Sequence, residues 1–358
     1  MAKINNLILL AAIFLIGCNK PINEEVTEFN PLDKTVLSLD GWEFSKSTYD
    51  FSINTRGLYF LNSEIGFVVG YNGDIYKTTD SGEMWTKQNS GTTLHLHSVF
   101  FLNENVGFVS SQSMNCLDAD CNKGCLLLKT TNGGETWTKT FFPNYLSIHS
   151  LKFFDELKGV AIIYTTGNNG MQNKKLATTS DGGINWSINN LEIIAPYDEL
   201  VFAGNLIFVA GKNQRIFKSS DYGQTWTTLN TPVKTTSDIR ELYFYNENIG
   251  YIDGVTEIFK TTDGGLSWIK TTFPFDGFGT LHFSNENEGF HLEYVSAYEG
   301  GDWPVFKGSI YYRTKDGGIT WTKSELIPSL SMNLTNFPQR ELGFAFWGST
   351  LYRMKKLD

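Results

Sequence analysis

Short apolar segments alternate with turns rich in Asn, Gly and Asp along most of the chain. The clearest unit begins with the segments 58–60, 66–70 and 74–77, which are separated by turns that contain Asn, Ser or Gly. A fourth segment, 85–87, follows a tight turn. Apolar segments this short, bounded by turn residues, predict β-strands rather than helices. The pattern therefore predicts a four-stranded antiparallel sheet as the repeating unit.

The tight turn carries a repeated sequence, S/T-x-D-x-G-x-x-W, in which Asn replaces Asp once. Asp or Asn can accept hydrogen bonds from nearby backbone N–H groups, Gly permits a positive φ, and Trp can cover the adjacent sheet. We therefore expect these residues to hold hairpins in a structural role. The six copies contribute Asp80 and Trp85, Asn132 and Trp137, Asp181 and Trp186, Asp221 and Trp226, Asp263 and Trp268, and Asp316 and Trp321.

The spacing of these tryptophans is about 40 to 50 residues, which is the period of propeller blades. Residues 335–353 supply three further strands that no such turn follows. The fourth strand is expected at 39–44, where Trp42 stands outside the repeat. Pairing the two ends of the chain would remove an exposed sheet edge. We therefore predict an all-β, seven-bladed propeller over 35–358, with four-stranded antiparallel blades and an N-terminal strand that closes the last blade.

The first residues have the pattern of a targeting signal. Lys3 precedes an apolar run at 7–16 that is too short to span a bilayer comfortably. The sequence Leu-Ile-Gly-Cys that ends at Cys18 resembles the lipobox of bacterial lipoproteins. We predict a signal peptide over 1–17, a lipidated Cys18 and a flexible tether over 18–34. The chain is then an exported, membrane-anchored lipoprotein that faces the periplasm or cell surface; a plain secretory signal is the alternative.

Composition limits the classes of partner. Hydrophobic residues make up 41% of the 358 residues and aromatic residues 15%, which is enough for a large core. The formal net charge is −9 and basic residues do not cluster. Nucleic acid is therefore excluded as an expected partner, because phosphate binding depends on Lys and Arg. We expect a monomer without a cofactor.

One face of the propeller is expected to carry the variation between blades. Strands alternate in direction, so the loops between second and third strands and those between blades share a face. Such loops are long at 112–124, 165–175 and 295–308, and long loops on one rim of a regular scaffold are usual binding sites. Cationic groups at the channel mouth could engage an acidic segment; polar residues that merely face water are the alternative. The candidate binding residues are Arg56, His97, His149, Arg240, Tyr298 and Trp303.

The first long loop also contains Cys116, Cys121 and Cys125. In an exported protein, three cysteines suggest one local disulfide with one thiol left over, or a bond to another chain. The acidic run 118–124 has a late Gly and no downstream Glu for a calcium loop, although calcium stays an open alternative. Zinc would lack a local fourth ligand. No metal site is predicted.

The repeated turn is similar to that of the BNR or Asp-box propellers. Together with the lipobox, the stretch G-F-V-V-G-Y-N-G-D-I-Y-K-T-T-D-S-G-E-M-W at 66–85 resembles the photosystem II assembly and stability factor family. That resemblance implies a non-enzymatic scaffold that binds a protein or peptide. Sialidases share the Asp-box but also have an F-R-I-P-like strand and an arginine triad, whereas residues 53–58 hold no such motif. A carbohydrate-binding protein or two-carboxylate glycoside hydrolase stays the alternative.

Overall fold

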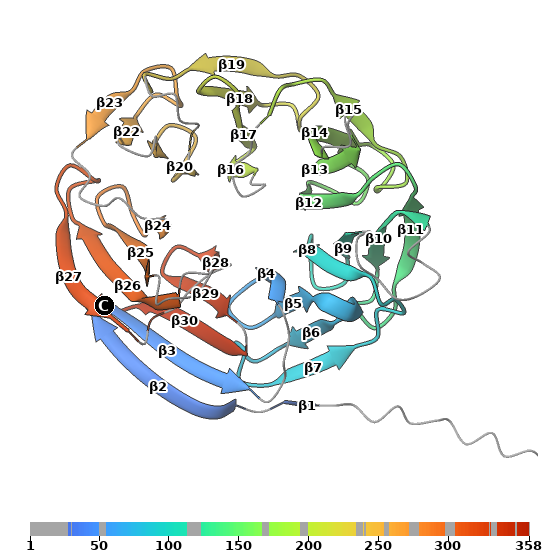
Figure 1. Cartoon of the computed structure of the whole chain (residues 1–358), viewed down its shortest axis with the longest axis horizontal. Coiled ribbons are helices and arrows are strands. Elements are labelled where there is room, and N and C mark those ends of the chain that lie inside the picture. The colour runs from blue at the N-terminus through green and yellow to red at the C-terminus, as the bar shows by residue number, and fades with distance from the viewer. Residues whose placement is uncertain are drawn as a thin grey trace, which may run out of the picture.

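The strands of the chain form a ring around a central axis (Figure 1). Strands β4, β8, β12, β16, β20, β24 and β28 lie nearest this axis, and each begins one unit of the ring. Within the described part of the chain, no helix is long and apolar enough to cross a membrane. The computed structural model describes residues 28–29, 31–49, 55–112, 123–166, 172–193, 200–233, 239, 241–253, 258–271, 279–297, 305–328, 330, 335–347 and 349–357.

Three units are separate sheets of four antiparallel strands that follow one another in chain order. The first consists of β16 (Val201–Ala203), β17 (Leu206–Gly211), β18 (Arg215–Ser219) and β19 (Thr227–Asn230). The second consists of β20 (Glu241–Phe244), β21 (Gly250–Asp253), β22 (Ile258–Thr261) and β23 (Ile269–Thr271). The third consists of β24 (Gly279–Phe283), β25 (Gly289–Ala297), β26 (Val305–Thr314) and β27 (Thr322–Ile327). The prediction of an all-β propeller with four-stranded antiparallel blades is confirmed.

The other three sheets contain more than four strands, and the closing sheet among them is described below. The unit after the N-terminal hairpin comprises β4 (Thr55–Phe60), β5 (Gly66–Gly70), β6 (Ile75–Thr78) and β7 (Trp85–Gln88), with a short 3-10 helix, η1 (Tyr71–Gly73), between β5 and β6. Its outer edge also pairs with β1 (Glu28–Phe29). A single eight-stranded sheet comprises β8 (His95–Phe101), β9 (Gly107–Gln112), β10 (Cys125–Thr130), β11 (Thr138–Phe142), β12 (Ser147–Phe153), β13 (Gly159–Thr166), β14 (Gln172–Thr179) and β15 (Ser187–Asn189).

The prediction of seven blades is wrong as a count of sheets, because the described strands form six hydrogen-bonded sheets. The difference arises in the eight-stranded sheet, where β8–β11 and β12–β15 each repeat the four-strand order. A single residue pair, Ser147 opposite Gln112, connects β12 to β9. No hydrophobic pattern encodes this one contact, so the sequence could not predict that two units join.

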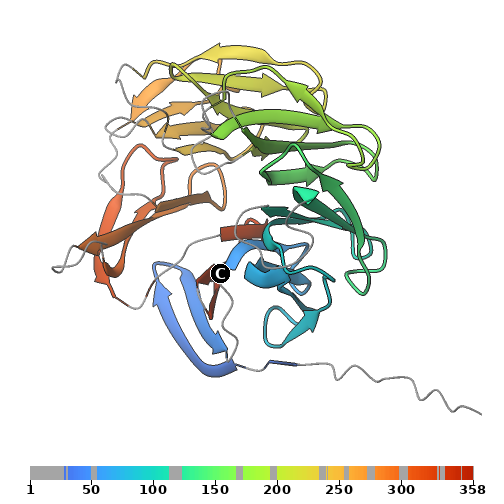
Figure 2. The same cartoon turned by 45° about the vertical axis from the view of Figure 1, so that its right-hand side comes forward.

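Both ends of the chain contribute to one sheet, which closes the ring. Its strands are β2 (Pro31–Leu39), β3 (Trp42–Tyr49), β30 (Thr350–Lys356), β29 (Leu342–Trp347) and β28 (Thr335–Gln339), in that spatial order. β3 pairs antiparallel with β30 from Trp42 opposite Lys356 to Thr48 opposite Thr350. Figure 2 shows the blue β2–β3 hairpin close to the C-terminal end of the chain. The N-terminal strand therefore closes the last unit, as predicted.

Strand pairing begins before residue 35, where the sequence analysis placed the start of the propeller. β1 and the first residues of β2 precede it and already pair with β7 and β3. β2 is an edge strand, and its residues 33–36 are exposed. An exposed edge needs no alternation of apolar and polar residues, so its sequence does not distinguish it from a tether.

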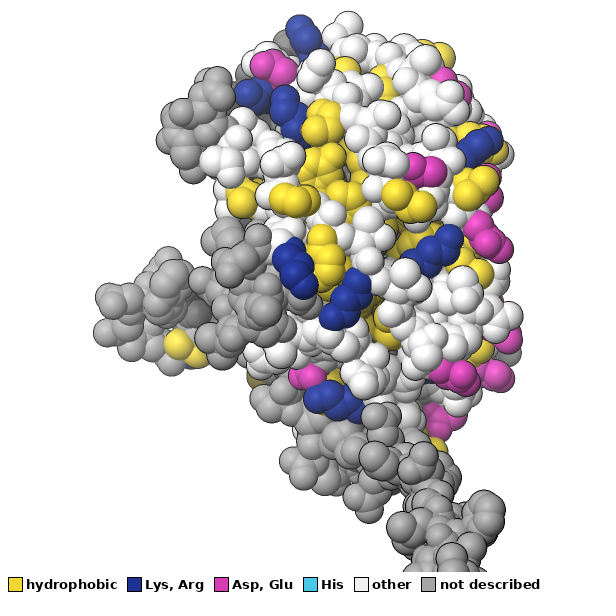
Figure 3. Space-filling model, turned by 90° about the vertical axis from the view of Figure 1, so that its right-hand side faces the viewer, with side chains coloured by type: hydrophobic (Ala, Val, Ile, Leu, Met, Phe, Trp, Pro, Cys, Tyr) yellow, Lys and Arg dark blue, Asp and Glu magenta, His cyan; other side chains and the backbone are white. Residues whose placement is uncertain are grey.

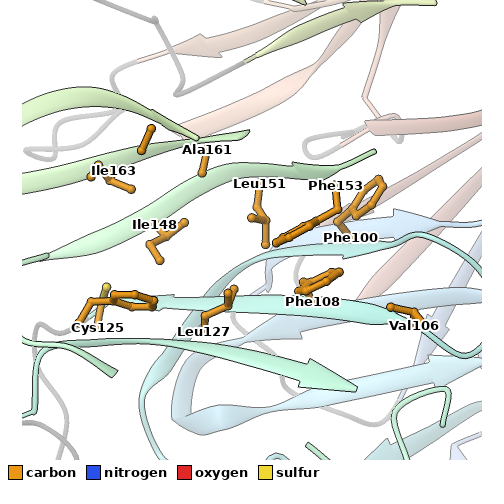
Figure 4. Close-up of a cluster of buried hydrophobic side chains, with 12 residues drawn as sticks. Phe100, Val106, Phe108, Cys125, Leu127, Ile148, Leu151, Phe153, Ala161 and Ile163 are labelled. Carbon is orange, nitrogen blue, oxygen red and sulfur yellow. The ribbon is translucent and has the colours of Figure 1, made fainter. Parts of the chain in front are cut away.

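Stacked aromatic side chains join neighbouring units. A Phe of the first strand in one unit lies nearly parallel to a Phe of the second strand in the preceding unit, with ring centroids 3.5 to 3.7 Å apart. Figure 4 shows one such contact, between Phe108 and Phe153, within a buried cluster to which β8 to β14 contribute. These contacts recur at four junctions and hold β4, β8, β12 and β20 against the preceding units. The pairs are Phe67 with Phe101, Phe108 with Phe153, Phe208 with Phe244, and Phe344 with Phe60.

The repeated turns share one set of hydrogen bonds. The Thr78 hydroxyl donates to Asp80 Oδ1 (2.8 Å) and accepts from the Gly82 N–H (2.9 Å). Asp80 Oδ1 also accepts from the Met84 N–H (2.9 Å). The same three bonds occur in the turns that contain Asn132, Asp181, Asp221, Asp263 and Asp316.

The tryptophans of these turns pack against the inner strands of their own units. Trp85, Trp137, Trp186, Trp268 and Trp321 each meet the first-strand Phe edge to face, at centroid distances of 6.1 to 6.3 Å. Trp226 donates from Nε1 to the Gly223 carbonyl (2.8 Å). The side chains of the repeated turns are therefore occupied in holding the hairpins and the core.

Candidate functional site

The inner strands surround a central cavity of about 950 Å³. Its described walls come from β4, β8, β12, β20, β24 and β28, with Tyr294 added from β25. This volume is near the upper end of the range for pockets that bury small ligands. Because the walls come from separate units, the ring itself, and not one blade, creates the site.

The structure brings three of the candidate binding residues together on the cavity wall. Arg56 is the second residue of β4, and His97 and His149 lie on β8 and β12. The rings of His97 and His149 stack with centroids 3.6 Å apart. Tyr164 extends this stack at 4.6 Å from His149. Two histidines and an arginine from neighbouring units therefore share one part of the wall.

Arg56 is held in place by an aromatic side chain. Its guanidinium lies 4.8 Å from the centre of the Tyr71 ring and donates a hydrogen bond to the Tyr71 hydroxyl. His95 packs on the same tyrosine with ring centroids 4.3 Å apart, and its Nδ1 accepts from the Asn72 N–H (3.2 Å). Burial, and then the positive charge of Arg56, lowers the pKa of His95. Arg56 is therefore the fixed positive charge on this part of the cavity wall.

A second arginine lines the cavity, and the sequence analysis did not single it out. Arg340 follows directly after β28, and its guanidinium lies 4.0 Å from the centre of the Tyr245 ring, which follows β20. It also donates to the Tyr245 hydroxyl. A signal was available in the sequence, because this turn departs from the repeat. In the corresponding turns, Asn62, Asn103, Asp155, Asn246 and Asn285 accept backbone N–H bonds.

The wall formed by β20, β24 and β28 is polar but mostly uncharged. The Tyr243 hydroxyl accepts from the Phe283 N–H (3.1 Å), and burial raises the pKa of Tyr243 to about 12. His282 stacks on Phe337 with ring centroids 3.5 Å apart, and its Nε2 lies 2.8 Å from the Arg340 carbonyl oxygen. Burial lowers the pKa of His282 to about 4. Both side chains are therefore neutral near pH 7.

The charge of the described lining is opposite in sign to that of the whole chain. Arg56 and Arg340 outnumber Glu241, which is the single carboxylate among the described lining residues, whereas the chain carries a net charge of −9. A two-carboxylate hydrolase needs a pair of such groups, of which the described wall supplies one. Figure 3 shows a view of the outer surface in which Asp and Glu gather along the right-hand edge.

The remaining candidate residues divide between the core and the undescribed part of the chain. Cys125 is a free cysteine, and it is buried in the cluster shown in Figure 4, where burial raises its pKa. The predicted disulfide among the three cysteines stays a prediction. The other predicted residues lie outside the described residues, so their roles stay predictions: Cys18, Cys116, Cys121, Arg240, Tyr298 and Trp303. No group of three or more potential metal ligands occurs among the residues that the structure describes.

No family model and no curated protein matches the chain. Among solved structures, the chain is similar to YCF48 bound to a D1 peptide, with a TM-score of 0.64, 18% identity, and coverage of 91% of this chain and 98% of that chain. The match to YCF48 from Cyanidioschyzon merolae has a TM-score of 0.59 and 15% identity, and it covers 90% of this chain and 98% of that chain. The match to the WD40 β-propeller domain of Doa1 has a TM-score of 0.54 and 9% identity, and it covers 92% of this chain and 97% of that chain. At these identities the likeness shows a shared propeller fold.

Proposed function

We propose that this protein is a non-enzymatic propeller scaffold that binds a segment of a protein or peptide partner in its central cavity. The observation that carries the proposal is the lining of that cavity, which contains two arginines, each packed on a tyrosine ring. These positive charges line a cavity in a chain whose net charge is negative. Arginine presents several N–H donors in a fixed plane, which suits carboxylates. The similar fold of YCF48, which has been solved with a bound D1 peptide, supports a peptide as the partner.

The proposal extends to family and location. The shared hydrogen bonds of the repeated turns support assignment to the BNR or Asp-box propellers. The lipobox pattern that ends at Cys18 supports export and a lipid anchor, with the protein facing the periplasm or cell surface. A monomeric scaffold on such an anchor can hold a partner segment close to the membrane surface.

Exchange mapping with a captured partner tests the proposed function. Proteins of the cell envelope are captured on the mature domain, and each crosslinked complex is analysed by hydrogen–deuterium exchange. Binding in the cavity should protect β4, β8, β20, β24 and β28. Protection limited to the repeated turns, or turnover of a chromogenic glycoside by the purified chain, would contradict the proposal.

The charge of Arg56 provides a second test of the same function. Arg56→Ala should weaken partner binding and reduce its dependence on salt, because screening acts on the lost interaction. Arg215→Ala is the matched control, since Arg215 is exposed and is not part of the cavity wall. Equal losses for the two variants would show that general charge, and not the cavity, drives binding.

A further inference from the structure

We infer that the partner segment is an extended peptide that spans the cavity and carries two carboxylates, one bound by Arg56 and one by Arg340. This inference rests on the proposed function and adds the conformation and charge spacing of the ligand. It depends on three observations: the arginines lie at opposite ends of the inner strands, one cavity reaches both, and the wall between them is largely uncharged.

The inner strands place the arginines at opposite mouths of the cavity. Every unit repeats the same meander with its first strand innermost, so the first strands share one direction. Arg56 is the second residue of its first strand, whereas Arg340 directly follows the last residue of β28. Phe337 of β28 holds the position of Phe60 in β4, because each meets the glycine that opens the second strand of its unit. Arg56 lies four residues before this position and Arg340 three residues after it, so their backbones are up to about 23 Å apart along the strands at roughly 3.3 Å per residue. Neighbouring acidic residues could not reach both guanidinium groups.

Each guanidinium is already oriented and retains donors. Arg56 lies over Tyr71 and Arg340 over Tyr245, and each donates a hydrogen bond to its tyrosine hydroxyl. A guanidinium has five N–H donors, so several remain for a carboxylate. Arg340 also reaches from the unit of β28 to that of β20, which fixes its charge at the mouth. The tyrosines reduce the conformational entropy that the arginines lose when the ligand binds.

The wall between the arginines suits an uncharged middle segment. Thr280 and Tyr294 lie 3.0 Å apart through their hydroxyl oxygens, and neutral Tyr243 and His282 lie nearby on the same wall. Hydroxyl groups can bind the peptide main chain in an extended segment. Glu241, the only acid among the described lining residues, is the first residue of β20 and so lies at the Arg56 end of the inner strands, where its Oε1 accepts from the Leu281 N–H (3.3 Å). The ligand is therefore expected to be acidic at both ends and uncharged between them.

Synthetic peptides test the spacing directly. Fluorescent capped peptides of equal length carry two Glu residues five positions apart, two adjacent Glu residues, one Glu, or Gln in place of both, with Ser and Ala elsewhere. The spaced peptide should bind about tenfold more tightly than the adjacent one, although their charges are equal. Arg56→Gln and Arg340→Gln should each reduce its affinity to that of the single-Glu peptide.

Controls separate charge from structure and this inference from the proposed function. Arg340→Lys should keep part of the affinity, Tyr245→Phe should keep most of it, and Arg215→Gln should change nothing. Variants are compared only after their melting transitions have been measured. Equal affinity for the spaced and adjacent peptides would overturn the two-carboxylate inference, as would an Arg340→Gln variant that binds the spaced peptide normally. If no peptide binds while a captured partner still protects the cavity strands, this inference is wrong and the proposed function stands.

Discussion

At the scale of single residues, the glycines that open the second strands have a steric role. A Cβ on Gly107 would lie 2.4 Å from the nearest ring atom of Phe101, and a Cβ on Gly66 would lie 2.5 Å from Phe60. The sequence shows that glycine recurs here but not why, because the phenylalanine belongs to the preceding strand of the same unit. Only the fold brings the two together. The glycine thus leaves the space that the phenylalanine ring occupies in the aromatic stack.

We predict that Gly107→Ala lowers the free energy of unfolding by about 1 to 3 kcal/mol, because the new methyl group overpacks the Phe101 ring. Chemical denaturation measures the loss. Adding Phe101→Leu to Gly107→Ala should restore part of the stability, relative to Phe101→Leu alone, since the smaller side chain makes room. A Gly107→Ala variant as stable as the natural chain would mean that the contact relaxes without cost.

The hydroxyl groups of the repeated turns are a second residue-scale feature. The Thr261 hydroxyl accepts from the buried Gly265 N–H (2.9 Å) and donates to Asp263 (2.8 Å). Thr261→Val keeps the shape but leaves that N–H without its acceptor, which should cost about 1 to 3 kcal/mol. Thr261→Ser is the matched control, because Ser219 makes the same bonds in another turn. Equal stability of the Val and Ser variants would contradict a structural role for the hydroxyl.

A lysine contact between units was missed by the sequence analysis. Lys77 precedes a repeated turn, donates to the Gly133 carbonyl of the next unit (2.9 Å) and lies over the Phe67 ring. Lys218 and Lys260 make equivalent contacts with the carbonyls of Gly264 and Gly317. The recurring K-[ST]-[ST]-[DN] could have indicated a role, but its partner carbonyl lies about one repeat away along the chain. A long-range backbone acceptor leaves no pattern in a sequence.

At the scale of elements, the strands with strict patterns were predictable and the edge strands were not. β5 is buried at every position, and β3 alternates from Trp42 through Phe44. The partner of β3 at the far end of the chain could therefore be inferred by counting strands. β2 and β1 make pairings at outer edges, where side-chain type is less constrained. The sequence analysis did not single out Arg340, whose only signal was a turn that departs in sequence from the others.

Ring closure by β3 predicts a stability difference between shortened chains. A chain that begins at residue 31 should melt cooperatively, whereas one that begins at residue 50 loses the pairing with β30 and exposes both core and edge. A chain that begins at residue 41 retains β3 and should lie between them, because β2 is largely exposed. Calorimetry gives the three transitions. Identical melting of the first and last chains would refute closure by β3.

His282 predicts a pH dependence at the junction between β24 and β28. Burial lowers its pKa to about 4, whereas an unfolded histidine titrates near 6.5. Between these values the unfolded chain binds the extra proton, so the contribution of neutral His282 is complete above about pH 6.5 and is lost as pH falls toward 4. The total is of order 3 kcal/mol.

Stability measured from pH 7 to pH 4 tests this dependence. His282→Phe keeps the stack on Phe337 but cannot titrate, so its stability should fall less steeply with pH than that of the natural chain. His95→Phe is the control at a less buried histidine. The same slope in His282→Phe and the natural chain would assign the acid sensitivity to other groups.

At the scale of the whole molecule, the ring separates two regions of charge. The chain is net negative, whereas two arginines face the cavity. The total charge and the propeller fold could be predicted from the sequence. The two arginines line the same cavity only once the ring has closed, so their proximity could not be predicted. A binding site assembled from several units cannot be read from any one repeat. If the N-terminal segment anchors the protein as proposed, it also sets the position of this site relative to the membrane.

The proposed anchor gives the last prediction. If Cys18 is lipidated, Cys18→Ala should release the protein from the membrane fraction or leave the precursor uncleaved, because the acyl chains that hold it there can no longer be attached. Fractionation and the mass of the mature protein measure both outcomes. An unchanged distribution together with normal processing would show that the protein is held in another way.

The pairing of β3 with β30 also has a consequence for the order in which the protein is made. The ribosome releases β3 early and β30 about 300 residues later, which corresponds to roughly 15 to 60 s of synthesis. During that time β3 has only one partner, the adjacent β2, and the two can form a hairpin at once. β2 would then cover one edge of β3 until the final strand arrives. β2 would thus keep that edge of β3 from pairing with other chains during synthesis.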